Sequence, residues 1–316
     1  MHEQEETTGP RVGFVGKLPA QADFVRQHLS DKVGGEFDRW LVKSTQTLLA
    51  AKAELPKAAV RFVFSAPQCD SVAIGVLTAS RDHVGREFPL AIYTALPAPL
   101  AARHALGLPL AYLQFLDAAE DVATGAVNSS AAELRARTAE LVAPTQEIVL
   151  AASQQCRDVL GQTQAGEMLG RVFAQVLPGG SLYALHTFMV AAEGARAAAP
   201  TAAPVVLDCP IATDVDLAAW IELGRRGLPA NTVCPTFAWV QVNPRLLMVL
   251  GPAPELLLHL VADPKHKSSR LWPLTTERME AIDRARDVLN NRLGSADNAL
   301  TMSLDSLWNQ LLPVRT

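Results

Sequence analysis

The sequence has few charged residues and no excess of positive charge. Charged residues make up 19% of the 316 residues, and the net charge at pH 7 is -4. Nucleic acids and anionic membranes are bound through clusters of Lys and Arg, so this composition predicts neither as a partner of the whole chain. Hydrophobic residues make up 49% of the chain, which is ample material for a core and excludes a disordered protein.

Cysteines are few, and no two of them form a CxxC pair. The four of them are widely spaced, at Cys69, Cys156, Cys209 and Cys234. This spacing fits neither a zinc knuckle nor a disulfide framework. It is typical of reduced thiols in a cytosolic protein, and we therefore expect the protein to be cytoplasmic.

Uninterrupted apolar runs of membrane-spanning length are also missing. The longest apolar stretch starts at Leu246 and is broken by Pro252 and Pro254 into pieces too short to cross a bilayer. Residues 1–10 are acidic and polar, without the positive and apolar regions of a secretion signal. We expect them to form a short disordered tail.

Signatures of catalysis are absent as well. The sequence contains no GxSxG and no HExxH, and none of its seven histidines sits beside a cysteine. A nucleotide-binding P-loop would need four residues between its glycines and a Ser or Thr after the lysine, whereas two residues separate Gly13 from Gly16 and Leu18 follows Lys17. We expect no enzymatic activity, no cofactor and no metal.

Short β-branched runs and amphipathic stretches predict an α+β fold. Strands are expected at residues 12–15, 60–64, 72–77, 90–96, 205–210, 237–242 and 245–250. Helices are expected at residues 23–29, 36–53, 110–122, 131–141, 147–160, 166–176, 182–199, 214–225, 255–261 and 277–293. The three closely spaced strands between residues 60 and 96 predict an antiparallel meander, because parallel strands would need a helix in each crossover.

This pattern predicts a mostly antiparallel sheet flanked by helices, then a helical middle and a smaller C-terminal α/β part. We place an N-terminal domain at residues 11–143 and a C-terminal helical and α/β region at residues 144–316. The Ala/Pro-rich residues 195–204 are the best candidate for a linker.

Two charged stretches could form a site. Asp23 has no titratable neighbour that would make it a catalytic acid or base, so we expect it to cap a helix or to join a buried ion pair. Arg86 lies at the start of an apolar strand and needs a carboxylate partner, for which Asp23 and Asp82 are the candidates. A hydrolase that uses these three residues in a cleft stays an alternative.

The segment from His259 to Arg270 offers two further possibilities. His259, Asp263 and His266 could ligate a metal, but Pro264 and the polar residues around it favour a solvated turn. Lys265, Lys267 and Arg270 make the most basic local run and could bind an acidic partner, or could be an ordinary solvated loop.

Two linked motifs resemble the TagF (ImpM) family of type VI secretion-associated proteins. The first motif comprises Gly16, Lys17, Leu18, Pro19, Asp23 and Phe24, followed by a helix with Trp40; the second comprises Asp82, Gly85, Arg86, Phe88 and Pro89. Ala22 stands where family members commonly carry a glycine.

The resemblance implies a regulator. It implies a cytosolic protein that represses a type VI secretion system after translation by binding a forkhead-associated scaffold protein or another component of the system. It gives the motif residues a structural role rather than a catalytic one. A structural subunit of the secretion apparatus is a further alternative.

Overall fold

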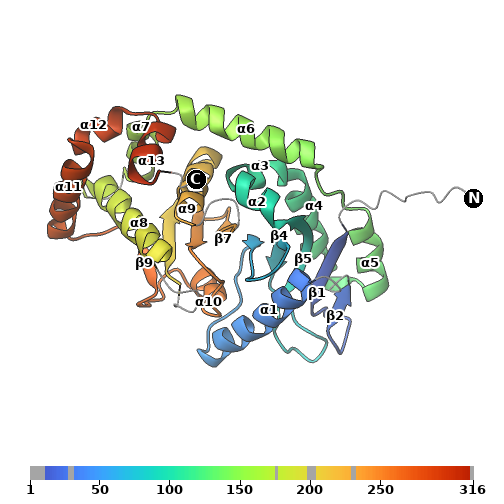
Figure 1. Cartoon of the computed structure of the whole chain (residues 1–316). Coiled ribbons are helices and arrows are strands. Elements are labelled where there is room, and N and C mark those ends of the chain that lie inside the picture. Colours follow the sequence, from blue (N-terminus) through green and yellow to red (C-terminus); the bar gives the residue numbers. More distant parts are fainter. Residues whose placement is uncertain (1–10, 28–31, 175–176, 198–203, 229–232, 314–316) are drawn as a thin grey trace, which may run out of the picture.

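One nine-stranded sheet runs through the computed structural model (Figure 1). The structure describes residues 11–27, 32–174, 177–197, 204–228 and 233–313. The strand order is β2-β1-β5-β4-β3-β7-β8-β6-β9. The strands are β1 (Val12–Gly16), β2 (Val25–Gln27), β3 (Val60–Phe64), β4 (Ser71–Thr78), β5 (Leu90–Pro97), β6 (Val206–Pro210), β7 (Thr236–Val240), β8 (Arg245–Val249) and β9 (Leu271–Pro273).

The sheet is antiparallel except at one edge. The predicted meander is confirmed, since β4 pairs antiparallel with both β3 and β5. The strands β7 and β8, at the positions predicted for two strands, form a hairpin, and Asn243 in its turn has a φ of 54°. Only the short β9 runs parallel to its neighbour β6. The predicted α+β class with a mostly antiparallel sheet is therefore confirmed.

The pairing of β3 with β7 joins the two parts of the chain. Three residue pairs carry it: Arg61 with Trp239, Phe62 with Ala238, and Val63 with Phe237. All five residues of β3 are buried. The predicted N-terminal and C-terminal parts thus contribute strands to the same sheet.

Helices account for most of the remaining described chain. They are α1 (Lys32–Ala50), α2 (Ala98–His104), α3 (Leu108–Ala111), α4 (Leu113–Thr124), α5 (Ala131–Ala139), α6 (Gln146–Gln162), α7 (Ala165–Val172), α8 (Gly180–Ala197), α9 (Asp214–Arg226), α10 (Leu257–Ala262), α11 (Met279–Leu293), α12 (Ala296–Thr301) and α13 (Leu304–Leu311), with 3-10 turns at Ala105–Gly107 and Gly125–Asn128. Among the described helices, none has the length and apolar character needed to span a bilayer.

The helices α1 and α10 cover one face of the sheet. Phe37 of α1 stacks on Phe62 of β3 with ring centroids 4.7 Å apart, and Tyr93 of β5 lies 5.4 Å from the same ring. Leu258 of α10 belongs to this cluster of buried side chains. Burial of large aromatic side chains stabilises this face and holds α1 in place.

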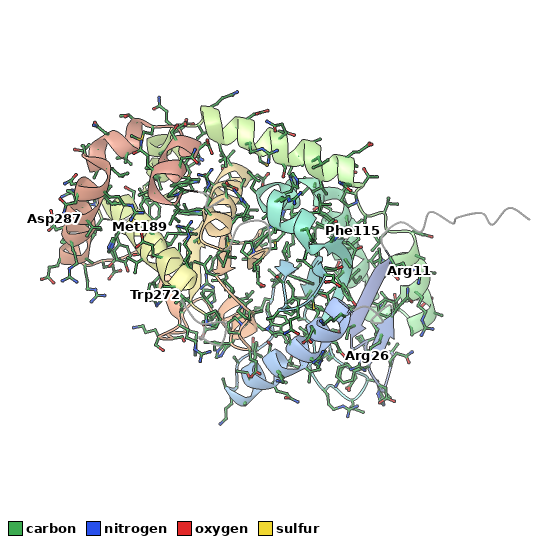
Figure 2. The ribbon with its side chains drawn as sticks, viewed as in Figure 1. Arg11, Arg26, Phe115, Met189, Trp272 and Asp287 are labelled. Carbon is green, nitrogen blue, oxygen red and sulfur yellow. The ribbon has the colours of Figure 1, made fainter. Side chains whose placement is uncertain are left out.

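The other face carries the larger core. Side chains from α4, α6, α8, α9 and α13 meet there in one continuous cluster. Phe115 of α4 and Met189 of α8 are both buried in it, and Figure 2 shows them in different parts of the molecule. Trp220 of α9 stacks between Phe188 and Trp308, with centroid distances of 5.7 and 6.2 Å. The core is thus shared by residues from both parts of the chain.

Several sequence predictions were wrong. Residues 25–27, which lie in the predicted helix 23–29, form the edge strand β2 and pair with β1. The helix expected at residues 110–122 is divided into α3 and α4. The helices α2, α12 and α13 and the strand β9 were not predicted.

Two predictions fall on residues that the structure does not describe. The expected disordered tail, residues 1–10, lies outside the described residues. So do residues 198–203 of the expected linker 195–204, while its first residues, 195–197, are the last turn of α8. The proposed boundary after residue 143 lies in the segment between α5 and α6 and stays a prediction.

Candidate functional site

The first motif forms a tight turn at the end of β1. Gly16 is the last residue of β1 and has a φ of 154°. A Cβ atom on Gly16 would lie 2.4 Å from the carbonyl oxygen of Pro89 and 2.6 Å from the Cα of Leu90. Only glycine permits this approach, so the first motif packs directly against the end of the second one.

Asp82 is the buried centre of a charged cluster made with the buried Lys17 and the exposed Arg86, here called the Asp82 cluster. Lys17 Nζ lies 2.9 Å from Asp82 Oδ2, and Arg86 Nε lies 2.6 Å from the same oxygen. Asp82 Oδ1 accepts the backbone N–H groups of Val84 at 3.1 Å and Arg86 at 2.9 Å. The side chain of Asp82 is fully buried, and both of its oxygens are hydrogen-bonded.

This environment keeps Asp82 ionised. Burial alone raises the pKa of Asp82, but hydrogen bonds from Lys17 and from the backbone and side chain of Arg86 outweigh burial and hold the pKa well below its ordinary value. A carboxylate with so low a pKa is a poor proton carrier near neutral pH. The arrangement suits a structural anchor better than an acid or base.

Lys17 is buried and directed at Asp82, so it is not open to a phosphate from solvent. Its side chain is 8% exposed, and its ammonium group also lies 5.2 Å from the centroid of the Phe24 ring. Phe24 packs edge-on against Phe88 at 4.7 Å, so aromatic residues of the two motifs are in contact beside Lys17. Ser80 Oγ donates to the carbonyl of Lys17 at 2.7 Å and adds another link between the motifs.

Asp23 plays neither of the roles expected for it. It is exposed, in a bend before β2, so the prediction that it caps a helix was wrong. Of the two candidate partners of Arg86, Asp82 is the one that accepts a hydrogen bond from its side chain. Arg86 Nη2 also donates to the carbonyl of Ala22 at 2.9 Å. The structure therefore brings Gly16, Lys17, Phe24, Asp82, Arg86, Phe88 and Pro89 together and leaves the carboxylate of Asp23 outside this cluster.

The remaining motif residues have different surroundings. Leu18 is fully buried in the larger core, and Pro19 is half-buried beside it. Gly85 has a φ of 87° in the turn between Asp82 and Arg86, where a left-handed backbone favours glycine. Trp40 Nε1 donates to the carbonyl of Pro254 at 3.1 Å, which ties α1 to the segment that precedes α10.

The three basic residues predicted to bind a partner lie apart from the Asp82 cluster. Lys265, Lys267 and Arg270 are exposed on the segment that connects α10 to β9. Ser268 and Ser269 of this segment line a large groove. Whether these three cations bind a partner stays a prediction.

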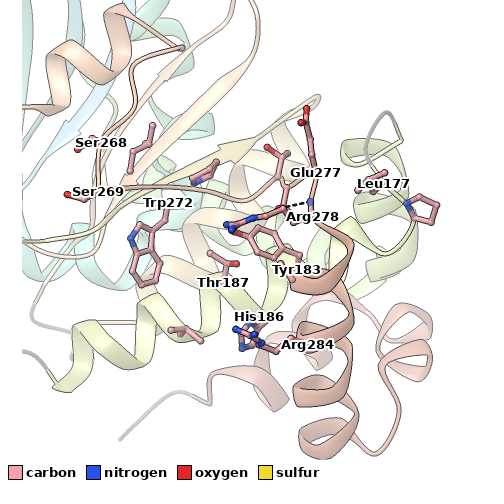
Figure 3. A pocket seen from close by; sticks show the side chains of 17 residues that line it. Leu177, Tyr183, His186, Thr187, Ser268, Ser269, Trp272, Glu277, Arg278 and Arg284 are labelled. Atoms are coloured by element: carbon pink, nitrogen blue, oxygen red, sulfur yellow. Dashed lines mark hydrogen bonds between the residues drawn. The ribbon is translucent and has the colours of Figure 1, made fainter.

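The groove itself was missed by sequence reasoning. It has a volume of about 1380 Å³ and lies between α8, β9 and the start of α11. Figure 3 shows His186 and Tyr183 of α8 on one wall, with Arg278 and Arg284 from the α11 segment close by. Burial is the main cause that lowers the pKa of His186, and the positive charge of Arg284 lowers it further.

The cations of the groove are available to a ligand. Arg278 and Arg284 are both exposed, and neither side chain forms an ion pair within the described part of the chain. Hydroxyl groups of Ser268, Ser269 and Thr275 supplement them. No local motif could have revealed this site, because its residues come from three separate segments that only the fold brings together.

Comparison with known proteins identifies the part of the chain that holds the two motifs. Residues 13–143 match the TagF N-terminal domain, described as type VI secretion system-associated. The chain therefore carries a TagF domain. The matched range contains β1 to β5, both motifs and the whole Asp82 cluster.

Solved structures are similar to part of the chain. Among them is the crystal structure of PA0076 from Pseudomonas aeruginosa PAO1, with 25% sequence identity and a TM-score of 0.35. The similarity covers 46% of this chain and 78% of PA0076. No curated protein matches the chain. The TagF domain supports a role related to type VI secretion.

Proposed function

We propose that the protein is a cytoplasmic regulator that represses a type VI secretion system by binding one of its protein components. The TagF domain at residues 13–143 is the observation that carries this proposal. The expected partner is a forkhead-associated scaffold protein. In this proposal the protein is a binding protein and not an enzyme.

The state of the motif residues supports a structural role for them. Lys17 and Arg86 both donate to the carboxylate of Asp82, and the ammonium group of Lys17 also lies 5.2 Å from the centroid of the Phe24 ring. An enzyme keeps its reactive groups open to substrate, whereas these groups stabilise the junction between two loops. The motifs then serve to hold the sheet edge that β1 and β2 form.

The groove between α8 and α11 is the proposed contact surface. Arg278 and Arg284 give it a positive character, with Glu277 as an acidic residue of the same lining, although the whole chain has a net charge of -4. The exposed Lys265, Lys267 and Arg270 extend this character along one side. Positive charge of this kind favours an acidic or phosphorylated segment of the partner, because guanidinium groups form paired hydrogen bonds with carboxylates and phosphates.

Co-purification with the scaffold protein tests the proposal. The wild-type protein should retain the scaffold, and the double substitution R278E/R284E should weaken its capture at least about tenfold, because it reverses the charge of two contacts. Arg135 of α5 is exposed and lies in the TagF domain, so Arg135→Glu is the matched control and should bind normally.

Secretion assays test the regulatory part. Overproduction of the wild-type protein should lower the secretion of type VI substrates, and R278E/R284E should lower it less. Absence of scaffold capture together with unchanged secretion after deletion would contradict the proposal. Stoichiometric recovery with the sheath or baseplate would favour a structural subunit.

A further inference from the structure

We propose that His259, Asp263 and His266 form a binding site for a divalent transition-metal ion. His259 lies on α10, Asp263 follows the last residue of that helix, and His266 lies on the segment that leads to β9. The sequence favoured a solvated turn here. The fold changes this interpretation, because the chain turns back after α10 and brings the ring of His266 to 4.0 Å from the ring of His259.

The three side chains are close enough to share one ion. One ligand atom from each residue can be chosen so that all three lie within 4.8 Å of one another. With metal–ligand bonds of about 2.0–2.1 Å, the ligands of a tetrahedral zinc ion are about 3.4 Å apart. Each ligand therefore has to move by about 1 Å or less, which rotation of the half-buried side chains of Asp263 and His266 provides.

Backbone contacts hold the ligands in this arrangement. The N–H of Asp263 donates to the carbonyl of His259 at 2.9 Å, and the N–H of His266 donates to the carbonyl of Asp263 at 3.1 Å. Asp263 Oδ1 accepts the N–H of Lys265 at 2.9 Å, which fixes the carboxylate and leaves Oδ2 for an ion. Pro264 restricts the backbone between them.

Burial differs among the ligands in a way that suits ion entry. His259 is 4% exposed, whereas Asp263 and His266 are half-buried at the protein surface. The buried imidazole has little rotational freedom and forms the base of the site. The two outer ligands can open to admit an ion from solvent.

The ligand set indicates which ions it suits. Two imidazole nitrogens and one carboxylate are typical ligands of Zn²⁺ and of other divalent first-row transition metals. Mg²⁺ and Ca²⁺ prefer sites made of oxygen atoms, and Cu(I) prefers sulfur. Three protein ligands leave a fourth tetrahedral position to water or to a group from a partner.

A bound ion would affect the neighbouring groove. It would fix the segment from Asp263 to Arg270 against the end of α10, and Ser268 and Ser269 of that segment line the groove. The same ion would restrict Lys265 and Lys267, which flank His266. Metal binding would thus order one wall of the groove, whether or not a partner is bound there.

Metal titration of the untagged full-length chain tests the site. We expect dialysis against Zn²⁺ to load one high-affinity ion per chain, and Asp263→Asn and His266→Ala each to weaken binding at least about tenfold. His83 is an exposed histidine in the other part of the chain, so His83→Ala is the control and should bind Zn²⁺ normally. Both ligand variants change partly exposed residues, and melting of the metal-free proteins will verify that they fold.

Co²⁺ provides a second readout. We expect visible d–d absorption without the thiolate charge-transfer absorption that cysteine ligation would give, and loss of this absorption in both ligand variants. The proposal is overturned if the wild-type chain binds no Zn²⁺. It is equally overturned if the ligand variants bind as tightly as the wild type, or if the Co²⁺ spectrum shows thiolate ligation.

Discussion

Lys17 Nζ and Asp82 Oδ2 lie 2.9 Å apart across 65 residues of sequence, and both side chains are buried. The pair joins the end of β1 to the loop that precedes β5. Arg86 completes the Asp82 cluster from the more exposed side.

Substitution of Lys17 should destabilise the fold. Lys17→Met keeps the aliphatic volume but deletes a charged hydrogen bond to a buried carboxylate, so the free energy of unfolding should fall by about 2 kcal/mol. Lys43 of α1 forms only an exposed ion pair with Glu255 at 3.6 Å, so Lys43→Met should cost less than about 0.5 kcal/mol. Urea denaturation measures both, and equal losses would contradict the assigned role.

Acid should weaken the Asp82 cluster. The pKa of Asp82 in the folded protein lies below its ordinary value of 3.8, so ionised Asp82 stabilises the fold above about pH 4. This contribution is lost as the pH falls towards the folded-state pKa, because the unfolded chain takes up the proton first. The stability difference between the wild type and Asp82→Asn should therefore be constant near pH 7 and shrink below pH 4.

The control for this measurement is Asp287, which is exposed on α11 (Figure 2). Asp287→Asn should leave the free energy of unfolding at pH 7 within about 0.5 kcal/mol of the wild type. Denaturant titrations between pH 7 and pH 3 provide the comparison. A difference between wild type and Asp82→Asn that grows on acidification would refute the predicted sign.

Gly16 should not tolerate a side chain. Because its Cβ would lie 2.4 Å from the oxygen of Pro89, Gly16→Ala should force β1 and β5 apart and cost about 2 kcal/mol. Gly35 lies in α1 with open space around its Cβ position, so Gly35→Ala should stabilise the protein by about 0.5–1 kcal/mol. In thermal melts we expect Gly16→Ala to lower the melting temperature and Gly35→Ala to raise it.

The hydrogen bond from Trp40 to Pro254 should help to hold α10 in place. Trp40→Phe retains an aromatic ring beside Phe37 but removes the indole donor, so we expect a loss of about 1 kcal/mol. Hydrogen exchange in α10 should become faster. Trp272 has an indole nitrogen with no hydrogen bond to a described residue, so Trp272→Phe is the control and should leave exchange in α10 unchanged.

Local patterns predicted most of the sheet. The strands β3, β4 and β5 are β-branched and aromatic and are separated by turn residues, so their positions could be predicted from sequence alone. The edge strand β2 was wrongly predicted as a helix because it has only three residues, and pairing with β1 decides its conformation. Edge strands of this length carry little sequence signal of their own.

Some missed helices did carry local signals. Ser295 and Ser303 accept the backbone N–H groups of Asn298 and Ser306, so each caps the start of a helix, α12 or α13. For α2 the local signal is a proline in the first turn of the helix, a position that proline favours. Capping residues in the sequence therefore mark the starts of α12 and α13.

The candidate sites could be predicted from the sequence only where their residues lie close together in the chain. Asp82 and Arg86 are four residues apart, so sequence could name Asp82 as one of two possible partners of Arg86. The contact between Lys17 and Asp82 could not be predicted, because 65 residues separate the two in the sequence. The groove and the His259–His266 contact require the turn after α10, which no periodic pattern encodes.

The pairing of β3 with β7 has a consequence for anyone who shortens this chain. The matched TagF domain ends at residue 143, whereas β7 begins at Thr236. A fragment that stops at residue 143 would leave β3, with the sequence VRFVF, as a bare strand edge whose N–H and C=O groups have no partner. Such a fragment would be prone to aggregation through edge-to-edge association, so the TagF domain of this protein is best purified with the strands that follow it.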